Sequence, residues 1–469
     1  MTSKLLLLIL FFISFTTLAG FDTTQRLHRL ISIYHQLEQF NGVALVAHKD
    51  QILLHRGYGQ ANVEWDIPHT IKGKFKLASI TKQFTAVLIL QLAEQGKVQL
   101  TDTILEHLPD YRQDTGKQIT IWQLLTHTSG LANFFHLPSY KDIESRNPYD
   151  LKTFIAQFCS EDLLFKPGSQ LRYSNAGYTI LGSIIETVTG KPYSKVAQER
   201  IFQPLGMHNS GVNGQYDILS HRVSGYQRTL TGLKHAEHID MSIPYSAGSI
   251  YSTSEDLFLW HRALADDTLL SEPWRKKLYT VTRHRNYAAG WLVDKLDTLN
   301  PHYTVTKVHH GGGIQGFNAS IARILEDDYL IVLLNNTGGA PMTEMTTNLL
   351  KILYGKTTKK PQPRFTQQLF QILSQQGVEA ALSWYHKEVE KNNGYSERGL
   401  NRFANQLLEV NHVEAAIAFL MLNVSTYPTS AKAHFALAEA YQKIGDIKQA
   451  KVIRAKANKL TNTPNKATK

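Results

Sequence analysis

The sequence predicts an α+β fold, in which one antiparallel sheet is flanked by helices, a helical region is inserted in the middle, and an all-α repeat tail follows. Strand hairpins lie near both ends of residues 20–355, helical patterns fill the interval between them, and the chain beyond residue 365 is helical and rich in alanine. With 469 residues, 42% of them hydrophobic and 19% charged, the chain is long enough for two domains. This composition excludes a disordered protein.

The two predicted hairpins are apolar runs separated by short polar turns. They cover residues 42–57 and 318–335. Because they come from opposite ends of the predicted domain, we expect the two chain ends to share one sheet. Between them the pattern predicts a helix from Ser79 to Gln95 and another from Thr179 to Val188.

Residues 1–19 have the pattern of a secretory signal peptide. Lys4 supplies a positive charge, Leu5–Phe15 is an apolar stretch too short to span a bilayer comfortably, and small residues precede a cleavage site at Ala19. Phe21 stands where a lipoprotein signal would need cysteine. We expect an exported protein, periplasmic or secreted, without stable membrane insertion after cleavage; an uncleaved anchor is the alternative.

Residues 365–469, behind a polar linker at 356–364, form the predicted helical tail. The segments Asn411–Ala416 and Gly445–Ala450 are similar and lie 34 residues apart, and Pro428 ends the first unit. This resembles tetratricopeptide repeats. A generic helical extension is the alternative. The repeat-like tail is a candidate surface for a protein partner.

The net charge of +11 belongs mainly to this tail. From residue 356 onward there are 17 Lys and Arg against 8 Asp and Glu, a net charge of +9, which leaves +2 for residues 1–355. Because the expected export separates the protein from most nucleic acid and no readout motif appears, we expect no nucleic-acid partner. The single cysteine, Cys159, excludes an intramolecular disulfide and a CxxC centre. The histidines form no metal-binding pattern, and we expect no metal and no cofactor.

The predicted helix at Ser79 carries the first chemical motif, Ser79-x-x-Lys82. Residues at positions i and i+3 share a helix face, so the Lys82 amine can reach the Ser79 hydroxyl. A serine becomes a good nucleophile when a neighbouring base takes its proton, and a desolvated lysine can act as that base. This is the only serine in the chain with a lysine three residues on. An N-cap serine beside a solvated lysine is the alternative.

Two further motifs follow at long spacings. Tyr173-x-Asn175, the only such pair in the chain, places a phenol beside an amide, although a packed tyrosine with a capping asparagine would have the same pattern. His309-His310 precedes Gly311–Gly313, whose backbone lets a ligand approach main-chain amides closely; a plain glycine turn is the alternative.

The three motifs in this order resemble the signature of the serine β-lactamase and penicillin-binding-protein superfamily. Additional segments are typical of its class C-like branch, which includes DD-carboxypeptidases, D-aminopeptidases and esterases: residues 119–131, 165–168, 204–207 and 247–253. The resemblance covers about residues 25–355.

The resemblance implies a role for each motif residue. Ser79 is the acylated nucleophile, Lys82 its proton acceptor, and Tyr173 passes protons to the leaving group. Asn175 holds Lys82 or a substrate amide. His310 is the catalytic residue of the third motif, rather than His309.

The same resemblance places Gly311, Gly312 and Gly313 beside the substrate. It implies an oxyanion hole formed by the backbone amides of Ser79 and Gly313.

The function that follows is an exported serine hydrolase that forms an acyl-enzyme on Ser79. Its substrates would be D-amino-acid peptides, as for a DD-carboxypeptidase or D-aminopeptidase, or small esters and amides. Histidine replaces the lysine that β-lactamases usually have in the third motif, so β-lactamase activity, the alternative, is expected to be weak. An alternative of another class is a non-catalytic envelope protein that binds a partner through the helical tail.

Overall fold

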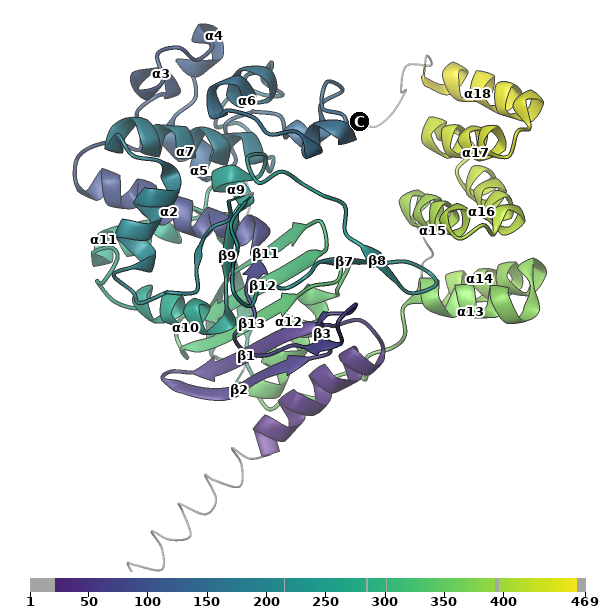
Figure 1. Ribbon diagram of the computed structural model, residues 1–469, viewed down its shortest axis with the longest axis horizontal. Helices are drawn as coiled ribbons and strands as arrows, with labels where there is room; N and C mark the ends of the chain where they lie inside the picture. The colour runs from purple at the N-terminus through teal and green to yellow at the C-terminus, as the bar shows by residue number, and fades with distance from the viewer. Residues whose placement is uncertain (1–21, 215, 284–285, 301, 393–395, 462–469) are drawn as a thin grey trace, which may run out of the picture. The chain divides into compact units, whose positions relative to one another are not determined.

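The computed structural model describes residues 22–214, 216–283, 286–300, 302–392 and 396–461 (Figure 1). The chain divides into two units: the first contains residues up to 361 except 228–234, and the second contains 228–234 and 362–469. The predicted signal peptide lies outside the described residues. Within the described part of the chain, no helix combines the length and the apolarity that crossing a bilayer requires.

A six-stranded antiparallel sheet forms the centre of the first unit and joins its two ends, which confirms the predicted fold class. Its order is β10-β11-β12-β13-β1-β2, with β1 (Gly42–His48), β2 (Gln51–Tyr58), β10 (Leu292–Asp297), β11 (Thr304–Ile314), β12 (Phe317–Ile324) and β13 (Tyr329–Asn335). β1 pairs with β13 from Gly42 opposite Asn335 to His48 opposite Tyr329. The two predicted hairpins are β1–β2 and β12–β13.

Apolar side chains on the two faces of this sheet belong to separate cores. A helix over residues 22–36 and α12 (Met342–Leu353) cover one face, where Leu349 packs in the same cluster as Val46. α2 (Thr81–Glu94) belongs to the core of the other face, where Phe84 shares a cluster with Leu45. Neighbouring residues of a strand point to opposite faces, so the whole apolar run of β1 is buried.

A helical region separates β5 from β6, as the sequence predicts. It contains α2, α3 (Ile104–His107), α4 (Gln113–Gly116), α5 (Ile121–Leu125), α6 (Leu151–Phe158), α7 (Asn175–Thr189) and α8 (Tyr193–Ala197), with short turns of helix η1 (Ala78–Ile80), η2 (Phe134–His136), η3 (Asp142–Arg146) and η4 (Gln198–Phe202). α7 begins at Asn175, four residues before its predicted start at Thr179. Glycine disfavours helix, but Gly177 is buried within the core, so tertiary packing extends the helix.

The remaining elements of the first unit are short. They are β3 (Gln60–Asn62) paired with β4 (Ile67–Pro68), β5 (Phe75–Lys76) and β6 (Gly211–Val212) paired with β9 (Ile250–Ser252), β7 (Tyr226–Arg228) paired with β8 (Leu233–His235), and the helices α9 (Tyr245–Gly248), α10 (Ser254–Ala263) and α11 (Glu272–Leu278).

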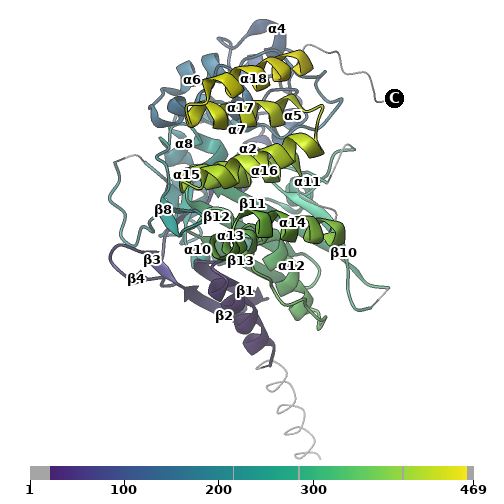
Figure 2. The same cartoon turned by 90° about the vertical axis from the view of Figure 1, so that its right-hand side faces the viewer.

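The second unit is helical, and its helices stack as successive pairs (Figure 2). They are α13 (Phe365–Gln376), α14 (Val378–Asn392), α15 (Glu397–Glu409), α16 (Val413–Thr426), α17 (Ala431–Lys443) and α18 (Ile447–Thr461). α15 and α17 begin 34 residues apart, at 397 and 431, and so do α16 and α18, at 413 and 447. This spacing equals the sequence offset. Membership of the tetratricopeptide family stays a prediction.

One core holds the second unit together. Leu369, Tyr385, Phe403 and Phe419 share a buried cluster, so α13 and α14 pack with the later helices. Leu230, from the segment 228–234, packs against this cluster.

Candidate active site

Ser79 lies in η1, at the point where the chain turns from β5 into α2. Ala78, the residue before it, has a φ of +50°, a left-handed conformation that costs a residue with a side chain of order 1–3 kcal/mol. The Leu77 N–H donates a hydrogen bond to the Ile250 carbonyl oxygen, 2.9 Å away, and fixes the start of this turn. Strained backbone of this kind is concentrated at functional sites.

Lys82 is fully buried, one turn into the helix from Ser79. Its Nζ lies 3.3 Å from Ser79 Oγ, 2.8 Å from Asn175 Oδ1 and 2.8 Å from the Ala247 carbonyl oxygen. Asn175 is held in turn, because its Nδ2 donates to Asn133 Oδ1 at 3.2 Å. The first two motifs therefore meet at one amine.

Burial lowers the pKa of Lys82 well below its usual range. A neutral lysine has two N–H groups and one lone pair. Asn175 Oδ1 and the Ala247 carbonyl accept the two N–H groups, which leaves the lone pair for the Ser79 hydroxyl. Lys82 is therefore placed as a base toward Ser79.

The Tyr173 side chain covers this amine. Lys82 Nζ lies 4.9 Å from the centre of the Tyr173 ring. The Tyr173 hydroxyl is buried and makes no hydrogen bond of normal geometry within the described structure. Burial raises the pKa of Tyr173, and the nearby Ser79 opposes the rise. Tyr173 is therefore a protonated phenol next to the nucleophile.

His310, on β11, faces the same side of the site and is neutral. Its Nδ1 lies 2.6 Å from the Gly311 carbonyl oxygen, which can only accept, so Nδ1 carries the proton. Nε2 then accepts a hydrogen bond from the Tyr287 hydroxyl at 3.0 Å. Burial, and to a lesser degree Lys82, lower the pKa of His310 to about 3.

His309 points the other way, as alternation along a strand requires. Its Nε2 lies 2.9 Å from Asp294 Oδ2 on β10. The structure thus brings His310, and not His309, to Ser79. Among the described residues, no group of three or more His, Cys, Asp or Glu side chains is placed to hold a metal ion.

The glycines of the third motif allow close packing against the nucleophile strand. A Cβ at Gly312 would lie 2.0 Å from the Leu77 carbonyl oxygen, so no side chain fits there. Gly311 and Gly313 alternate with Gly312 and are exposed. Gly313 and Ser79 line the same recess, which suits a pair of oxyanion donors.

Ser79 lies between two recesses. A cavity of about 460 Å³ has an aromatic wall formed by Tyr173, Tyr287 and His310. A smaller recess of about 60 Å³ is lined mainly by apolar residues, including Phe135 and Ile239, and by Gly313. The two recesses give separate places for the two sides of a scissile bond.

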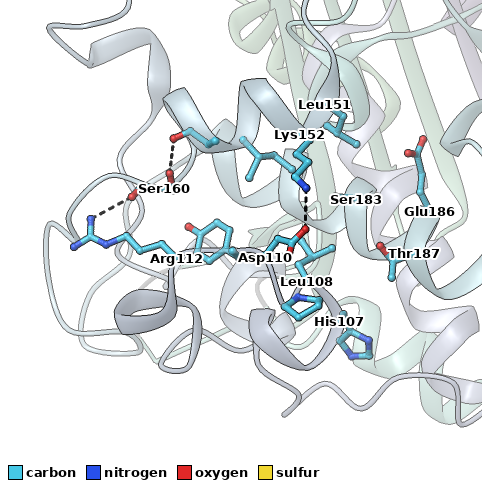
Figure 3. Close-up of a pocket in the computed structure, with 14 residues that line it drawn as sticks. His107, Leu108, Asp110, Arg112, Leu151, Lys152, Ser160, Ser183, Glu186 and Thr187 are labelled. Atoms are coloured by element: carbon cyan, nitrogen blue, oxygen red, sulfur yellow. Dashed lines mark hydrogen bonds and ion pairs between the residues drawn. The ribbon is translucent and has the colours of Figure 1, made fainter.

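A larger cavity, of about 610 Å³, lies elsewhere in the helical region (Figure 3). Its wall includes His107, Leu151 and Thr187, and Lys152 Nζ forms an ion pair with Asp110 at 2.8 Å (Figure 3). None of the motif residues lines it. The chemical groups converge at the smaller cavities, which we take as the active site.

Sequence reasoning missed several residues of the site. Tyr287 lies outside every motif and segment, and Asn133 lies just after the segment 119–131. Ala247 opens the segment 247–253, but nothing in the sequence indicated that its carbonyl oxygen would contact Lys82. His127, inside the segment 119–131, packs against Tyr173 with ring centres 4.2 Å apart and the ring planes tilted by 43°. The resemblance of residues 119–131 to the superfamily is the signal that could have identified His127.

The fold and the serine–lysine–tyrosine site define the class of serine hydrolases related to β-lactamases and penicillin-binding proteins. The family model Beta-lactamase matches residues 29–355. The chain belongs to this family.

Three similar proteins illustrate the family. Bacillus subtilis PbpX is 29% identical over 263 residues, which is 56% of this chain and 64% of that protein. The penicillin binding protein from Bacillus halodurans is 27% identical, with a TM-score of 0.61 over 69% of this chain and 100% of that one. A D-stereospecific amidohydrolase from Streptomyces is 25% identical, with a TM-score of 0.59 over 71% and 98%. The chain spans less than two thirds of the length of the curated relatives it matches.

Proposed function

We propose that the protein hydrolyses amide or ester bonds of small D-amino-acid substrates through an acyl-enzyme on Ser79. The observation that carries this proposal is the geometry around Lys82: two carbonyl oxygens occupy its N–H groups, and its lone pair faces Ser79 Oγ at 3.3 Å. Burial lowers the pKa of this amine well below its usual range and so favours the neutral form.

The reaction has two halves. Ser79 Oγ attacks the substrate carbonyl carbon while its proton moves to Lys82 Nζ, and the backbone N–H groups of Ser79 and Gly313 stabilise the negative oxygen. The bond to the leaving group then breaks, and the Tyr173 hydroxyl supplies the leaving atom with a proton that Lys82 restores. Water attacks the acyl carbon in the second half and releases the acid and the free serine.

Two observations favour neutral amides and esters over β-lactams. His310 is neutral and its Nε2 is occupied by Tyr287, so it offers no positive charge to a substrate carboxylate. The small apolar recess next to Gly313 suits a small acyl side chain. The likeness to a D-stereospecific amidohydrolase supports the D-configuration. DD-carboxypeptidase activity and weak β-lactamase activity are the alternatives within the class.

Labelling tests the proposed nucleophile. Purified protein is treated with a fluorophosphonate probe and with a fluorescent penicillin, and the modified serine is mapped by mass spectrometry. We expect labelling at Ser79, loss of labelling in Ser79→Ala, and unchanged labelling in the exposed-site control Ser169→Ala. Absence of Ser79-dependent labelling with both probes contradicts the proposal.

A substrate panel then separates the alternatives. D-alanine amide, its L-enantiomer, p-nitrophenyl acetate, a D-Ala-D-Ala peptide and nitrocefin are compared by kcat/KM. We expect D-alanine amide and the ester to exceed the D-Ala-D-Ala peptide and nitrocefin. A preference for nitrocefin contradicts the substrate assignment but not the nucleophile.

Export and partner binding are separate parts of the proposal. Export rests on the signal pattern of residues 1–19 and is tested by cell fractionation of the full chain and a deletion of those residues. Partner binding rests on the 34-residue repeat and on the exposed apolar side chains of Met421, Ile444 and Val452 in the helical unit. Substituting these three by serine is expected to abolish capture of a partner by the full chain.

A further inference from the structure

A third cavity, of about 160 Å³, lies beside β5, the strand that leads to Ser79, and it is lined by three cations. They are Lys74, Lys76 and Arg222. None of the residues that line this cavity is acidic. The mechanism proposed for Ser79 uses none of them.

Lys76 is the central group of this cavity. Within the described part of the chain its Nζ has no acidic partner and no hydrogen bond, and it faces the Phe317 ring with the ring centre 5.8 Å away. Burial, and then Arg222, lower the pKa of Lys76. A desolvated cation without a counter-charge is unfavourable, and a second and third cation beside it add repulsion.

The backbone holds these cations together. The Lys74 N–H donates to the His221 carbonyl oxygen at 2.9 Å, and the Val223 N–H donates to the Lys74 carbonyl oxygen at 3.2 Å. Arg222 is therefore fixed next to Lys74 by the chain on both sides of it. Lys76 pairs with Tyr251 between β5 and β9.

The nearest carboxylate on this loop, Asp217, is used elsewhere. Its Oδ2 accepts the Gly214 N–H at 2.9 Å, and only its backbone carbonyl accepts from Arg222, at 2.8 Å. Asp217 does not line the cavity. No carboxylate lines the cavity, and the charges of Asp217 and Asp256 act on it only through Tyr251, whose pKa is raised by burial and then by Asp217.

We propose that this cavity is an anion-binding subsite that takes a carboxylate or a phosphate group. Three cations supply the charge, and Asn213 and Tyr251 on the wall add neutral hydrogen-bond donors. Lys76 and Ser79 are three residues apart, so their Cα atoms are at most about 11 Å apart. The anion is therefore either a distal group of the substrate acylating Ser79 or a separate molecule.

Binding is measured first, without reference to activity. Inorganic phosphate and acetate are titrated into the full chain by calorimetry and thermal unfolding, with chloride holding the ionic strength constant. We expect phosphate to raise Tm by several degrees in the wild type and in the control Lys72→Met, whose lysine is exposed on the preceding turn. Lys76→Met and Arg222→Gln are expected to weaken binding at least tenfold.

The unfolding temperature without phosphate separates a binding role from a structural one. Lys76→Met removes an unpaired cation, so it is expected to unfold at or above the wild-type temperature. If Lys76→Met instead lowers Tm and phosphate protects all variants equally, Lys76 is structural and the proposal is wrong. The exposed Arg222 provides the second variant, whose folding does not depend on a buried side chain.

Kinetics then identify the source of the anion. N-succinyl- and N-acetyl-D-alanine p-nitrophenyl esters differ in one distal carboxylate. A lower KM for the succinyl ester that disappears in Lys76→Met, but not in Lys72→Met, assigns the anion to the substrate. Equal KM values with Lys76-dependent phosphate binding assign it to a separate molecule. If neither phosphate binding nor the ratio of the two esters' KM values depends on Lys76 and Arg222, the subsite does not exist. If Ser79 proves not to be the nucleophile, the phosphate-binding result still stands or falls by itself.

Discussion

Lys76 and Lys82 stand three residues on either side of Ser79, yet their surroundings are opposite. Burial lowers the pKa of both. Three oxygen atoms lie within 3.3 Å of Lys82 Nζ. Lys76 has an aromatic ring and a second cation, Arg222, as its neighbours.

This comparison shows that desolvation does not define the role of a lysine. Acceptors that use up two N–H groups leave Lys82 with a lone pair directed at a hydroxyl, which suits proton exchange. A lysine without acceptors has no such exchange partner, and the other cations near Lys76 favour an incoming anion. The arrangement of neighbouring dipoles and charges decides between the two roles.

The largest effect is expected when the Lys82 amine, which exchanges a proton with Ser79, is removed. Lys82→Met keeps the length and apolar volume of the side chain, and we expect kcat/KM to fall about 10³–10⁴-fold, in the upper range for a lost general base. Fluorophosphonate labelling rates and ester hydrolysis measure it, with Lys72→Met as the control. Labelling of Lys82→Met within tenfold of the wild-type rate would show that another group accepts the proton.

The second-largest effect is expected from a substitution that places a negative charge next to Lys82. Asn175→Asp places a carboxylate where Oδ1 now lies, 2.8 Å from Nζ, and an opposite charge at this distance raises a lysine pKa by about 1–3 units. Because Lys82 acts as a base only when neutral, the acid limb of the kcat/KM profile should move to higher pH by the same amount. The loss of activity relative to the wild type should therefore grow as the pH falls along this limb.

Asn175→Leu is the matched control for this change. It removes the same acceptor without adding charge, so it disfavours the protonated amine further and should not move the limb upward. Equal shifts in both variants would show that the limb does not report Lys82.

The third effect tests the strand contact that the two lysine sites share. A Cβ added at Gly312 would clash with the carbonyl oxygen of Leu77, the residue that follows Lys76. A Cβ added at Gly311 would have its nearest neighbour, the Ala319 carbonyl oxygen, 3.8 Å away. We expect Gly312→Ala to cost about 1–3 kcal/mol of unfolding free energy and Gly311→Ala to cost little. Urea unfolding measures both. A similar cost for the two would mean that the strands separate freely at Gly312.

The sequence predicted the parts of this site that depend on local geometry. Ser79 and Lys82 meet because helical spacing brings them together, and the sheet follows from the apolar runs and polar turns of its two hairpins. The choice of His310 over His309 came from the family resemblance, and strand alternation in the structure explains it. The fold class and the family needed no tertiary information.

The contacts that the motif residues make with other parts of the chain depend on tertiary packing. The spacing of residues along the sequence does not reveal them. Tyr287 reaches His310 from a loop outside every motif, and its hydroxyl donates to Nε2 of the imidazole. The early start of α7 has the same cause, because burial of Gly177 outweighs its low helix propensity. The bridge between Lys74 and Arg222 likewise joins segments more than a hundred residues apart.

The smallest effect concerns the charge of His310. A neutral His310 lines the Ser79 cavity, whereas Lys74, Lys76 and Arg222 line the anion-binding subsite proposed above. The folded pKa of about 3 lies below the ordinary value of 6.5, so this residue contributes stability that is complete above pH 6.5 and declines as pH falls toward 3. Tyr287→Phe removes the donor to Nε2, leaves the neutral imidazole without its hydrogen bond, and raises the pKa of His310.

The acid-induced loss of stability between pH 7 and pH 4 should therefore be smaller in Tyr287→Phe, by about 1 kcal/mol, although the variant is less stable at pH 7. Tyr111→Phe is the control, because its buried hydroxyl donates to the Cys159 carbonyl oxygen at 2.7 Å and has no histidine partner. Thermal unfolding across this pH range measures both. If Tyr287→Phe and Tyr111→Phe lose stability in acid equally, the Tyr287 hydroxyl does not contribute to the low pKa of His310, and burial and Lys82 account for the neutral imidazole.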